Sequence, residues 1–362
     1  MPDFRDKTPD HRYKVLVVDD SALMRRILTE IINQAPDLEV VDTAVDPYQA
    51  REKIKQCNPD VLTLDVEMPR MDGITFLRNL MRLRPMPVVM ISSLTDQGAQ
   101  VTLDALETGA IDFITKPRLD LKEGIEEKAA VIIEKIRMAA TVSKDKLLRK
   151  QQQLQKLQQR EKRQDTFAQP TFATTDKLIA IGASTGGLDA IRDVLIGLPT
   201  SVPGVVVAQH IPGAFSRSFA ERLDRMLPLK VEEAYEGAPI TTGRVYIARG
   251  DRHLEVVRSG AKYVCQLNDG PLVNRHKPSV GVLFDSVAKA AGKNALGVML
   301  TGMGKDGAEA MLRLKETGAS TIAQDEASCV VWGMPGAAVK LGAVGQVLPL
   351  NGISDEIIRW AR

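Results

Sequence analysis

The sequence predicts an α/β protein built from two doubly wound parallel-sheet domains. Short apolar runs alternate with segments in which apolar residues recur at helical spacing. Strands that are buried on both faces read as unbroken apolar runs of this kind. A chain of 362 residues is long enough for two domains with full cores. The alternation is interrupted by one long polar stretch, which divides the chain.

The first domain is expected over residues 13–138. Its predicted strands are 13–20, 38–44, 60–69, 86–93 and 111–117, and its predicted helices are 21–34, one through Ala50 and Ile54, 73–84, 97–107 and 123–138. Strict alternation of strand and helix is typical of a parallel sheet with helices on both faces.

Residues 139–176 are expected to form an interdomain linker. KDKLLRKQQQLQKLQQREKRQ has too few apolar residues for a core of its own, and the QDTFAQPTFATTD that follows is turn-like. We interpret the stretch as a solvated spacer, although its basic charge would also suit an anionic partner.

The second domain is expected over residues 177–362. Its predicted strands are 177–183, 204–210, 295–302 and 320–325, and its predicted helices are 187–198 and 306–317. Three shorter segments, RVYIA, LEVVR and YVCQL, are separated by Gly, Asn and Asp turns. They predict an antiparallel hairpin insertion around 244–268.

Composition narrows the function classes. The net charge of +2 gives no global reason to expect nucleic-acid or membrane binding. Cys57, Cys265 and Cys329 are odd in number and far apart, so no disulfide framework is implied and a reducing cytoplasm fits best. The N-terminus lacks the apolar core of a signal peptide, and no apolar run approaches the roughly 18–20 residues that span a bilayer. We therefore expect a cytoplasmic protein without membrane insertion.

Polar residues follow the strands of the first domain at the edge where parallel sheets bind ligands. Asp19 and Asp20 follow the first strand, Asp65 the third, Ser92 the fourth and Lys116 the fifth. Any one of these could be a helix cap or a plain turn. Together, three carboxylates in one crevice would repel each other without a cation, and oxygen ligands suit Mg²⁺. With the cation in place the Asp65 carboxylate could attack a phosphoryl group, which Lys116 and Ser92 would contact.

This set resembles the flavodoxin-like receiver domain of two-component response regulators. The acidic pair, the aspartate before VEMPRMDG, the hydroxyl of ISS and the KP turn stand in the family's order. The resemblance implies that Asp65 accepts phosphate from a histidine kinase. It also implies that Phe113 is the switch aromatic and that Glu67 gives its backbone carbonyl to the metal.

The second domain opens with LIAIGASTGG, residues 178–187, a strand that ends in a glycine-rich turn. Such a turn could cradle a phosphate, present Ser184 as a nucleophile, or be an ordinary turn. The glycines do not match the dinucleotide pattern GxGxxG, and His210 stands where a ribose-binding acid is expected. No helix-turn-helix with a basic recognition helix follows residue 177. A nucleotide-binding or DNA-binding output is kept as the alternative to an enzyme.

A nucleophilic serine needs a base, and the chain has four histidines. His210 is favoured because it ends the apolar strand that follows the Ser184 strand. His11 is in the leader, His253 in a hairpin-like segment and His276 in a polar loop.

The third member of a triad should be a carboxylate after another strand. Asp306 in TGMGKDG is favoured over Asp325, because glycines let backbone N–H groups approach a substrate. Asp306 could also simply cap a helix. The N–H of Met303 is the candidate oxyanion donor.

GASTGG, the strand ending in QH, TGMGKDG and QDEASCVVWGMP, behind a receiver and a linker, resemble the chemotaxis protein-glutamate methylesterases of the CheB family. The resemblance implies a catalytic α/β esterase domain with Ser184 as nucleophile, His210 as base and Asp306 as its orienter, and no cofactor in that domain. It implies hydrolysis of glutamate methyl esters, and deamidation of glutamines, on chemoreceptor cytoplasmic domains. Phosphorylation of the receiver is expected to activate the enzyme by relieving a block of the catalytic crevice.

Overall fold

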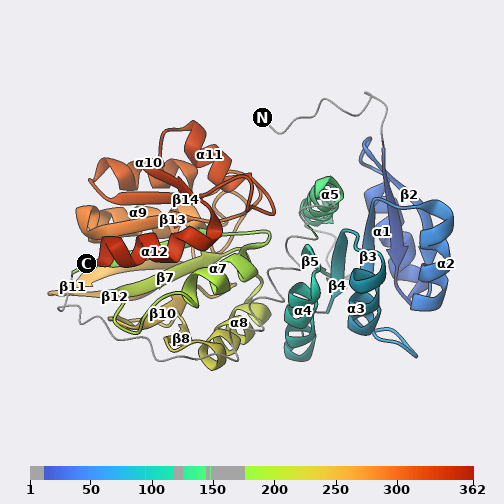
Figure 1. The fold of residues 1–362 in the computed structure, drawn as a ribbon, viewed down its shortest axis with the longest axis horizontal. Coiled ribbons are helices and arrows are strands. Elements are labelled where there is room, and N and C mark those ends of the chain that lie inside the picture. Colours follow the sequence, from blue (N-terminus) through green and yellow to red (C-terminus); the bar gives the residue numbers. More distant parts are fainter. Residues whose placement is uncertain (1–11, 94, 117–124, 144–146, 148–175) are drawn as a thin grey trace. The chain divides into compact units, whose positions relative to one another are not determined.

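The computed structural model describes residues 12–93, 95–116, 125–143, 147 and 176–362. The chain divides into two compact units, Met1–Gln164 and Asp165–Arg362, both with a parallel sheet and helices (Figure 1). The predicted fold class is confirmed for both. Most of the predicted linker, 139–176, lies outside the described residues, and its bounds stay a prediction.

The first unit contains one five-stranded parallel sheet in the order β2-β1-β3-β4-β5. The strands are β1 (Tyr13–Val18), β2 (Leu38–Ala44), β3 (Val61–Asp65), β4 (Val88–Ser92) and β5 (Asp112–Thr115). The helices are α1 (Ala22–Ile32), α2 (Pro47–Cys57), α3 (Gly73–Leu83), α4 (Asp96–Thr108) and α5 (Ile125–Thr141). Every residue of β3 and β4 is buried, which explains why these strands read as continuous apolar runs.

The second unit contains a seven-stranded sheet in the order β15-β14-β13-β6-β7-β10-β8, and its strand pairs are parallel. The strands are β6 (Leu178–Ala183), β7 (Gly204–Gln209), β8 (Lys230–Glu233), β10 (Arg244–Ile247), β13 (Ala295–Met299), β14 (Ser320–Gln324) and β15 (Gln346–Leu348). The helices are α7 (Gly187–Leu195), α8 (Gly213–Met226), α9 (Val280–Ala290), α10 (Ala308–Glu316), α11 (Met334–Lys340) and α12 (Leu350–Ala361).

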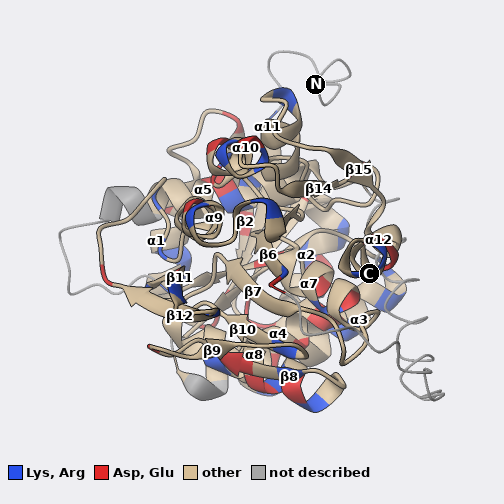
Figure 2. Ribbon diagram, turned by 90° about the vertical axis from the view of Figure 1, so that its left-hand side faces the viewer, with Lys and Arg blue, Asp and Glu red and all other residues tan. Residues whose placement is uncertain are grey.

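Helices cover both faces of this sheet. Figure 1 shows α9, α10 and α11 on one side and α7 and α12 on the other, where the Ser354 hydroxyl of α12 bonds the Val194 carbonyl of α7. Figure 2 shows acidic and basic residues mixed along α8, α10 and α12, whereas β6 and β7 carry none. All residues of β6 and β7 are buried, so these two strands form the centre of the core.

The antiparallel insertion is smaller than the sequence suggests. β11 (His253–Ser259) and β12 (Lys262–Asn268) form the hairpin, and β9 (Pro239–Ile240) pairs with β12. RVYI, placed in the insertion by the sequence analysis, is instead β10 of the main sheet, between β7 and β8. Val245, Tyr246 and Ile247 are fully buried there. A strand of four residues has too little local pattern to reveal which sheet it joins.

Candidate active site and phosphoacceptor site

The structure brings three predicted carboxylates together in the first unit. One oxygen from each of Asp19, Asp20 and Asp65 lies within 4.8 Å of the others, at the carboxyl ends of the neighbouring strands β1 and β3. Helix capping does not explain them, because Ser21 caps α1 and Asp72 caps α3. None of the three clustered carboxylates is therefore the N-cap of α1 or α3.

The electrostatics of this cluster fit a hard cation. Burial and the neighbouring Asp65 raise the pKa of Asp19 to about 6. Burial also raises the pKa of Asp65, although the Lys116 ammonium donates a hydrogen bond of 2.8 Å to Asp65 Oδ2. Asp19 Oδ2 is buried and has no hydrogen-bond partner among the described residues. Mg²⁺ prefers such oxygen ligands and would offset their repulsion.

The other predicted receiver residues surround the cluster in different ways. The Glu67 N–H donates to Asp65 Oδ1 at 3.3 Å, and its side chain is exposed. The Ser92 hydroxyl is buried and accepts a hydrogen bond of 2.7 Å from Thr102 of α4. Phe113 is buried, with the Lys135 ammonium 5.1 Å from its ring centre. The roles predicted for Glu67, Ser92 and Phe113 stay predictions.

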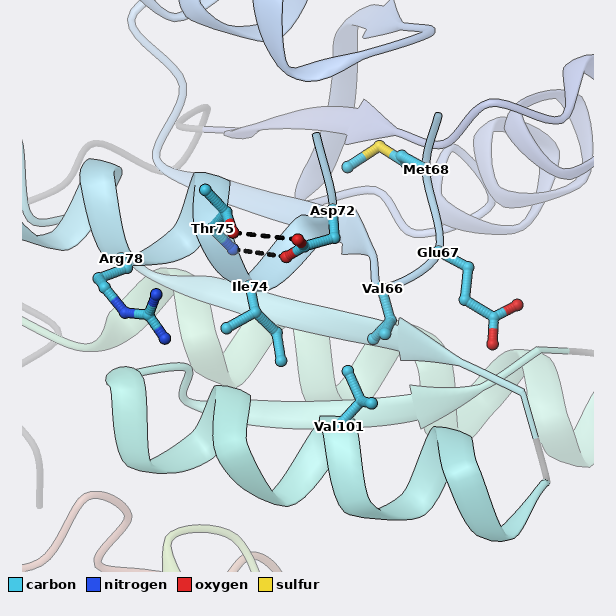
Figure 3. A pocket seen from close by; sticks show the side chains of 8 residues that line it. All are labelled: Val66, Glu67, Met68, Asp72, Ile74, Thr75, Arg78 and Val101. Atoms are coloured by element: carbon cyan, nitrogen blue, oxygen red, sulfur yellow. Dashed lines mark hydrogen bonds between the residues drawn. The ribbon is translucent and has the colours of Figure 1, made fainter. Parts of the chain in front are cut away.

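A hollow of about 580 Å³ lies beside the loop between β3 and α3 (Figure 3). Its lining residues are Val66, Glu67, Met68, Asp72, Ile74, Thr75, Arg78 and Val101. Figure 3 shows Asp72 turned toward Thr75, with which it makes two hydrogen bonds. None of the three clustered carboxylates lines the hollow, but Glu67, whose N–H donates to Asp65, does, so the hollow adjoins the carboxylate cluster.

In the second unit, Ser184 follows β6 in a turn that is tied to both neighbouring strands. Its backbone N–H donates to the Thr301 carbonyl at 3.1 Å. Its own carbonyl accepts from the Gly187 N–H at 2.7 Å and from the Gln209 amide at 2.9 Å. Gly186, with φ +75°, starts α7 in the left-handed region that glycine favours. Ser184 is half-buried in this braced turn.

His210 and Asp306 lie together. His210 Nε2 is 2.9 Å from Asp306 Oδ2, and both side chains are almost fully buried. β13 and β7 flank β6, so the turns that carry Asp306, Ser184 and His210 follow three adjacent strands. The backbone N–H of His210 also donates to the Ala183 carbonyl at 3.2 Å, next to Ser184.

The alternatives to this pair have other partners. The two ring nitrogens of His253 bond the Pro271 carbonyl and the Ser279 N–H. Asp325 accepts hydrogen bonds from the Ser328 N–H and hydroxyl. Asp306 does not cap α10, whose N-cap is Gly307. His11 lies outside the described residues.

Asp306 is kept ionised by a dense set of donors. Asn274 Nδ2 and Ser279 Oγ each bond Oδ1 at 2.8 Å, and the Val280 N–H bonds Oδ2 at 2.7 Å. Burial alone would raise the pKa of Asp306, but the bonds from His210, Asn274 and Ser279 outweigh it and lower the pKa below its ordinary value. Gln209, Asn274 and Ser279 were not among the site residues predicted from the sequence. Only Gln209 had a sequence signal, in the QH that ends the strand.

The hydrogen bond assigns the tautomer of His210. A carboxylate only accepts, so the proton on neutral His210 sits on Nε2. Nδ1 then carries the lone pair, and it is buried without a hydrogen-bond partner among the described residues. Nδ1 is thus the nitrogen available as a base.

The turn after β13 approaches Ser184 closely. A Cβ at Gly302 would lie 2.9 Å from Ser184 Cβ and would overlap Met334 Sδ. The Thr301 hydroxyl fixes the turn by donating to the Thr185 carbonyl at 3.0 Å and accepting from the Val331 N–H at 3.0 Å. Met303, the predicted oxyanion donor, follows directly in the chain, and its role stays a prediction.

An acidic cluster on one unit, and a buried His210–Asp306 pair next to the Ser184 turn on the other, are what a response regulator with an enzymatic output is expected to carry. Comparisons with known proteins agree. The CheB methylesterase family matches residues 179–357, and the response regulator receiver domain family matches residues 15–126. The chain belongs to the CheB methylesterase family.

Individual relatives are close. The chain is 72% identical over 348 residues to a protein-glutamate methylesterase/protein-glutamine glutaminase 1 of Hahella chejuensis, with 96% of each chain covered. It is 55% identical over 347 residues to the corresponding protein of Escherichia coli O157:H7, again with 96% of each covered. The CheB methylesterase catalytic domain of Thermotoga maritima matches with a TM-score of 0.50 and 36% identity, covering 51% of this chain and 98% of that one. Among the described helices, none has the length and apolar character needed to span a membrane.

Proposed function

We propose that this protein hydrolyses glutamate methyl esters, and deamidates glutamine side chains, on the cytoplasmic domains of chemoreceptors. The observation that carries the proposal is the buried His210–Asp306 hydrogen bond beside the braced Ser184 turn. The names of the close relatives supply the substrate class. Because the chain belongs to the CheB methylesterase family, we no longer consider a nucleotide-binding or DNA-binding output.

In the proposed reaction Ser184 Oγ attacks the ester carbonyl while His210 Nδ1 takes the hydroxyl proton. Asp306 holds Nε2–H and stabilises the imidazolium that forms. The Met303 N–H donates to the oxyanion of the tetrahedral intermediate. His210 then gives its proton to the departing methoxide, releasing methanol. Water, deprotonated by His210, cleaves the acyl-enzyme to a glutamate side chain and restores Ser184. With a glutamine substrate the leaving group is ammonia.

The receiver is proposed to accept a phosphoryl group from a histidine kinase on Asp65. Asp19, Asp20, Asp65 and the Glu67 carbonyl would hold Mg²⁺, which supplies charge neutralisation at the phosphoryl oxygens when bound. Lys116 and Ser92 would contact those oxygens, and Phe113 would be the aromatic that responds. The hydrogen bond of 2.8 Å from the Lys116 ammonium to the Asp65 carboxylate supports this assignment.

We propose that the unphosphorylated receiver inhibits the catalytic domain and that phosphorylation of the receiver relieves this inhibition. A fragment of residues 177–362 should then be more active than the unphosphorylated full chain. Equal or lower activity of the fragment would argue against inhibition by the receiver.

The compartment proposed is the cytoplasm. Cys57, Cys265 and Cys329 are all free thiols, which suits a reducing environment, and the substrate domains are cytoplasmic.

The test of the function is methanol release from methylated receptor membranes, with and without acetyl phosphate and Mg²⁺. Ser184→Ala should abolish release while phosphorylation at Asp65 persists. Asp65→Asn should show the reverse, with basal release retained and no response to acetyl phosphate. Normal turnover in Ser184→Ala would refute the triad.

A further inference from the structure

A second histidine lies against the proposed base. The rings of His210 and His276 are parallel to within 9°, with their centres 3.6 Å apart. His276 is half-buried and comes from the loop between β12 and α9. His276 takes no part in the proposed reaction, and that reaction therefore does not explain why its ring stacks so closely on His210.

The turn that carries His276 is tight and strained. The backbone N–H groups of Val273 and His276 each donate to the carbonyl of the other residue, at 3.1 and 2.9 Å. Asn274 and Arg275 between them have φ values of 52° and 67°. Asparagine tolerates this left-handed region, whereas arginine there is strained. Strained residues persist where the surrounding structure holds them, and they gather at functional sites.

The same turn reaches both members of the His–Asp pair. Its tip places Asn274 Nδ2 2.8 Å from Asp306 Oδ1, and its last residue stacks on His210. A two-residue turn with both central residues left-handed fixes the spacing between its tip and its last residue. The turn therefore holds the Asn274 and His276 side chains in register with Asp306 and His210.

The hydrogen bond at Nε2 leaves one motion of the His210 ring poorly restrained. Nε2 lies nearer than Nδ1 to the axis of rotation about the Cβ–Cγ bond, so a rotation about that axis moves Nε2 less than Nδ1. The hydrogen bond to Asp306 therefore tolerates ring rotations that displace Nδ1, the nitrogen proposed to accept the Ser184 proton. A flat ring packed at van der Waals distance against the imidazole face opposes this rotation.

We propose that His276 is a positioning residue for catalysis, whose ring face holds the His210 imidazole in the plane that directs Nδ1 to Ser184. The role needs a flat ring and no proton transfer by His276. This inference rests on the proposed function, because it assigns His210 Nδ1 as the base.

The test compares His276→Ala, His276→Phe and Arg275→Ala in the full-length protein activated with acetyl phosphate and Mg²⁺. Phenylalanine keeps a flat face without ring nitrogens, and alanine removes the face. Arg275→Ala changes the same turn at an exposed residue and serves as the matched control. Two rates are measured: methanol release from methylated receptor membranes, with kcat and KM separated, and labelling of Ser184 by a fluorophosphonate. Both are normalised to the folded fraction from tryptophan fluorescence.

His276→Ala should lower kcat and the labelling rate together, by about 10- to 100-fold, with KM changed less than about 2-fold, because the misplacement acts on the chemical step. His276→Phe should keep both rates within about 3-fold of the unmodified protein, and Arg275→Ala within about 2-fold. The proposal is overturned if His276→Phe is as impaired as His276→Ala, or if His276→Ala keeps full activity.

Labelling separates failure of this inference from failure of the proposed function. Fluorophosphonate labelling needs the nucleophile and base but no receptor. If the unmodified protein labels at Ser184 and releases no methanol, the proposed substrate is wrong, and the labelling rates of the variants still decide the role of His276.

Discussion

The side-chain amide of Gln209 donates a hydrogen bond of 2.9 Å to the backbone carbonyl of Ser184. Gln209 is the last residue of β7 and immediately precedes His210. One buried side chain thus connects the end of β7, next to the proposed base, to the turn that carries the proposed nucleophile. We expect the spacing of these two turns to depend on this bridge.

Gln209→Glu should weaken both stability and activity. The Ser184 carbonyl would keep its bond from the Gly187 N–H, but a glutamate oxygen cannot donate to it. We expect facing this carbonyl with a buried acceptor in place of a donor to cost about 1–3 kcal/mol. Guanidinium denaturation followed by tryptophan fluorescence measures this cost in the catalytic unit, because Trp332 and Trp360 both lie there. Asn351→Asp, the same amide-to-carboxylate change at an exposed residue of α12, should shift stability by less than about 0.5 kcal/mol. Equal shifts in the two variants would contradict the bridging role.

Gly302→Ala should inactivate the enzyme. The added methyl would lie 2.9 Å from Ser184 Cβ and against Met334 Sδ, so the nucleophile turn has to move. We expect kcat to fall by about 100-fold, the effect of misplacing a reacting group by about 1 Å. Gly304→Ala is the control in the same turn: its methyl meets open space, and only its φ of +79° is unfavourable. It should cost about 1 kcal/mol of stability and keep most of the activity.

The carboxylate of Asp306 should make the catalytic unit sensitive to acid. Its pKa is lower in the folded protein than the ordinary value of about 3.9, so it stabilises the fold above that pH. The contribution is lost as pH falls through the lowered pKa. Asp306→Asn should therefore be less stable than the unmodified protein at pH 7, and the gap should narrow as pH falls from about 4 toward 2.

Tryptophan fluorescence over a pH series of denaturation curves measures this gap. Asp355→Asn, on the exposed side of α12, should show no gap at any pH. A gap for Asp306→Asn that stays constant down to pH 2 would mean that its carboxylate is not stabilised in the folded state.

Magnesium affinity should depend on pH through Asp19. Its pKa of about 6 means that it becomes protonated in the folded protein as pH falls through that value, and a protonated carboxyl competes with the cation. Titration calorimetry with MgCl₂ should show weaker binding at pH 5.5 than at pH 7.5. Asp19→Asn should bind weakly at both pH values.

Asp72→Asn is the matched control for that titration. Asparagine caps a helix as well as aspartate does, and Asp72 lies outside the carboxylate cluster. Its Mg²⁺ affinity should match that of the unmodified protein at both pH values. An affinity for Mg²⁺ that does not change between pH 5.5 and 7.5 would contradict the role of Asp19.

The fold was largely predictable from the sequence because most strands are buried on both faces. VVMI and VVVA could be located from apolar content alone, and the polar residues after them were expected at the carboxyl-end edge of each sheet. RVYI was misplaced because a four-residue strand looks the same in a parallel sheet and in a hairpin. The helices α8 and α9 were not predicted, although both bury residues at helical spacing, such as Phe219 and Leu223 in α8 and Leu283 and Val287 in α9.

The candidate site, like the fold, could be predicted from the sequence only in part. The sequence brought out Ser184, His210 and Asp306 because each follows a strand, and the structure places His210 on Asp306. Asn274, Ser279 and His276 could not be found this way, because they lie in a loop whose path depends on two left-handed residues and on tertiary contacts. A loop has no periodicity from which to infer what its side chains touch.

The position of β13 beside β6 also affects when the proposed active site can form during synthesis and folding of the chain. Leu178 pairs with Ala295, so the central pairing of the sheet joins segments that are far apart in the chain. A nascent chain that has reached residue 294 already contains Ser184 and His210 but has neither β13 nor Asp306. Pairings of such long range form late in folding. Esterase activity is therefore expected only after β13 has joined the sheet, and fragments that end before residue 295 are expected to be inactive.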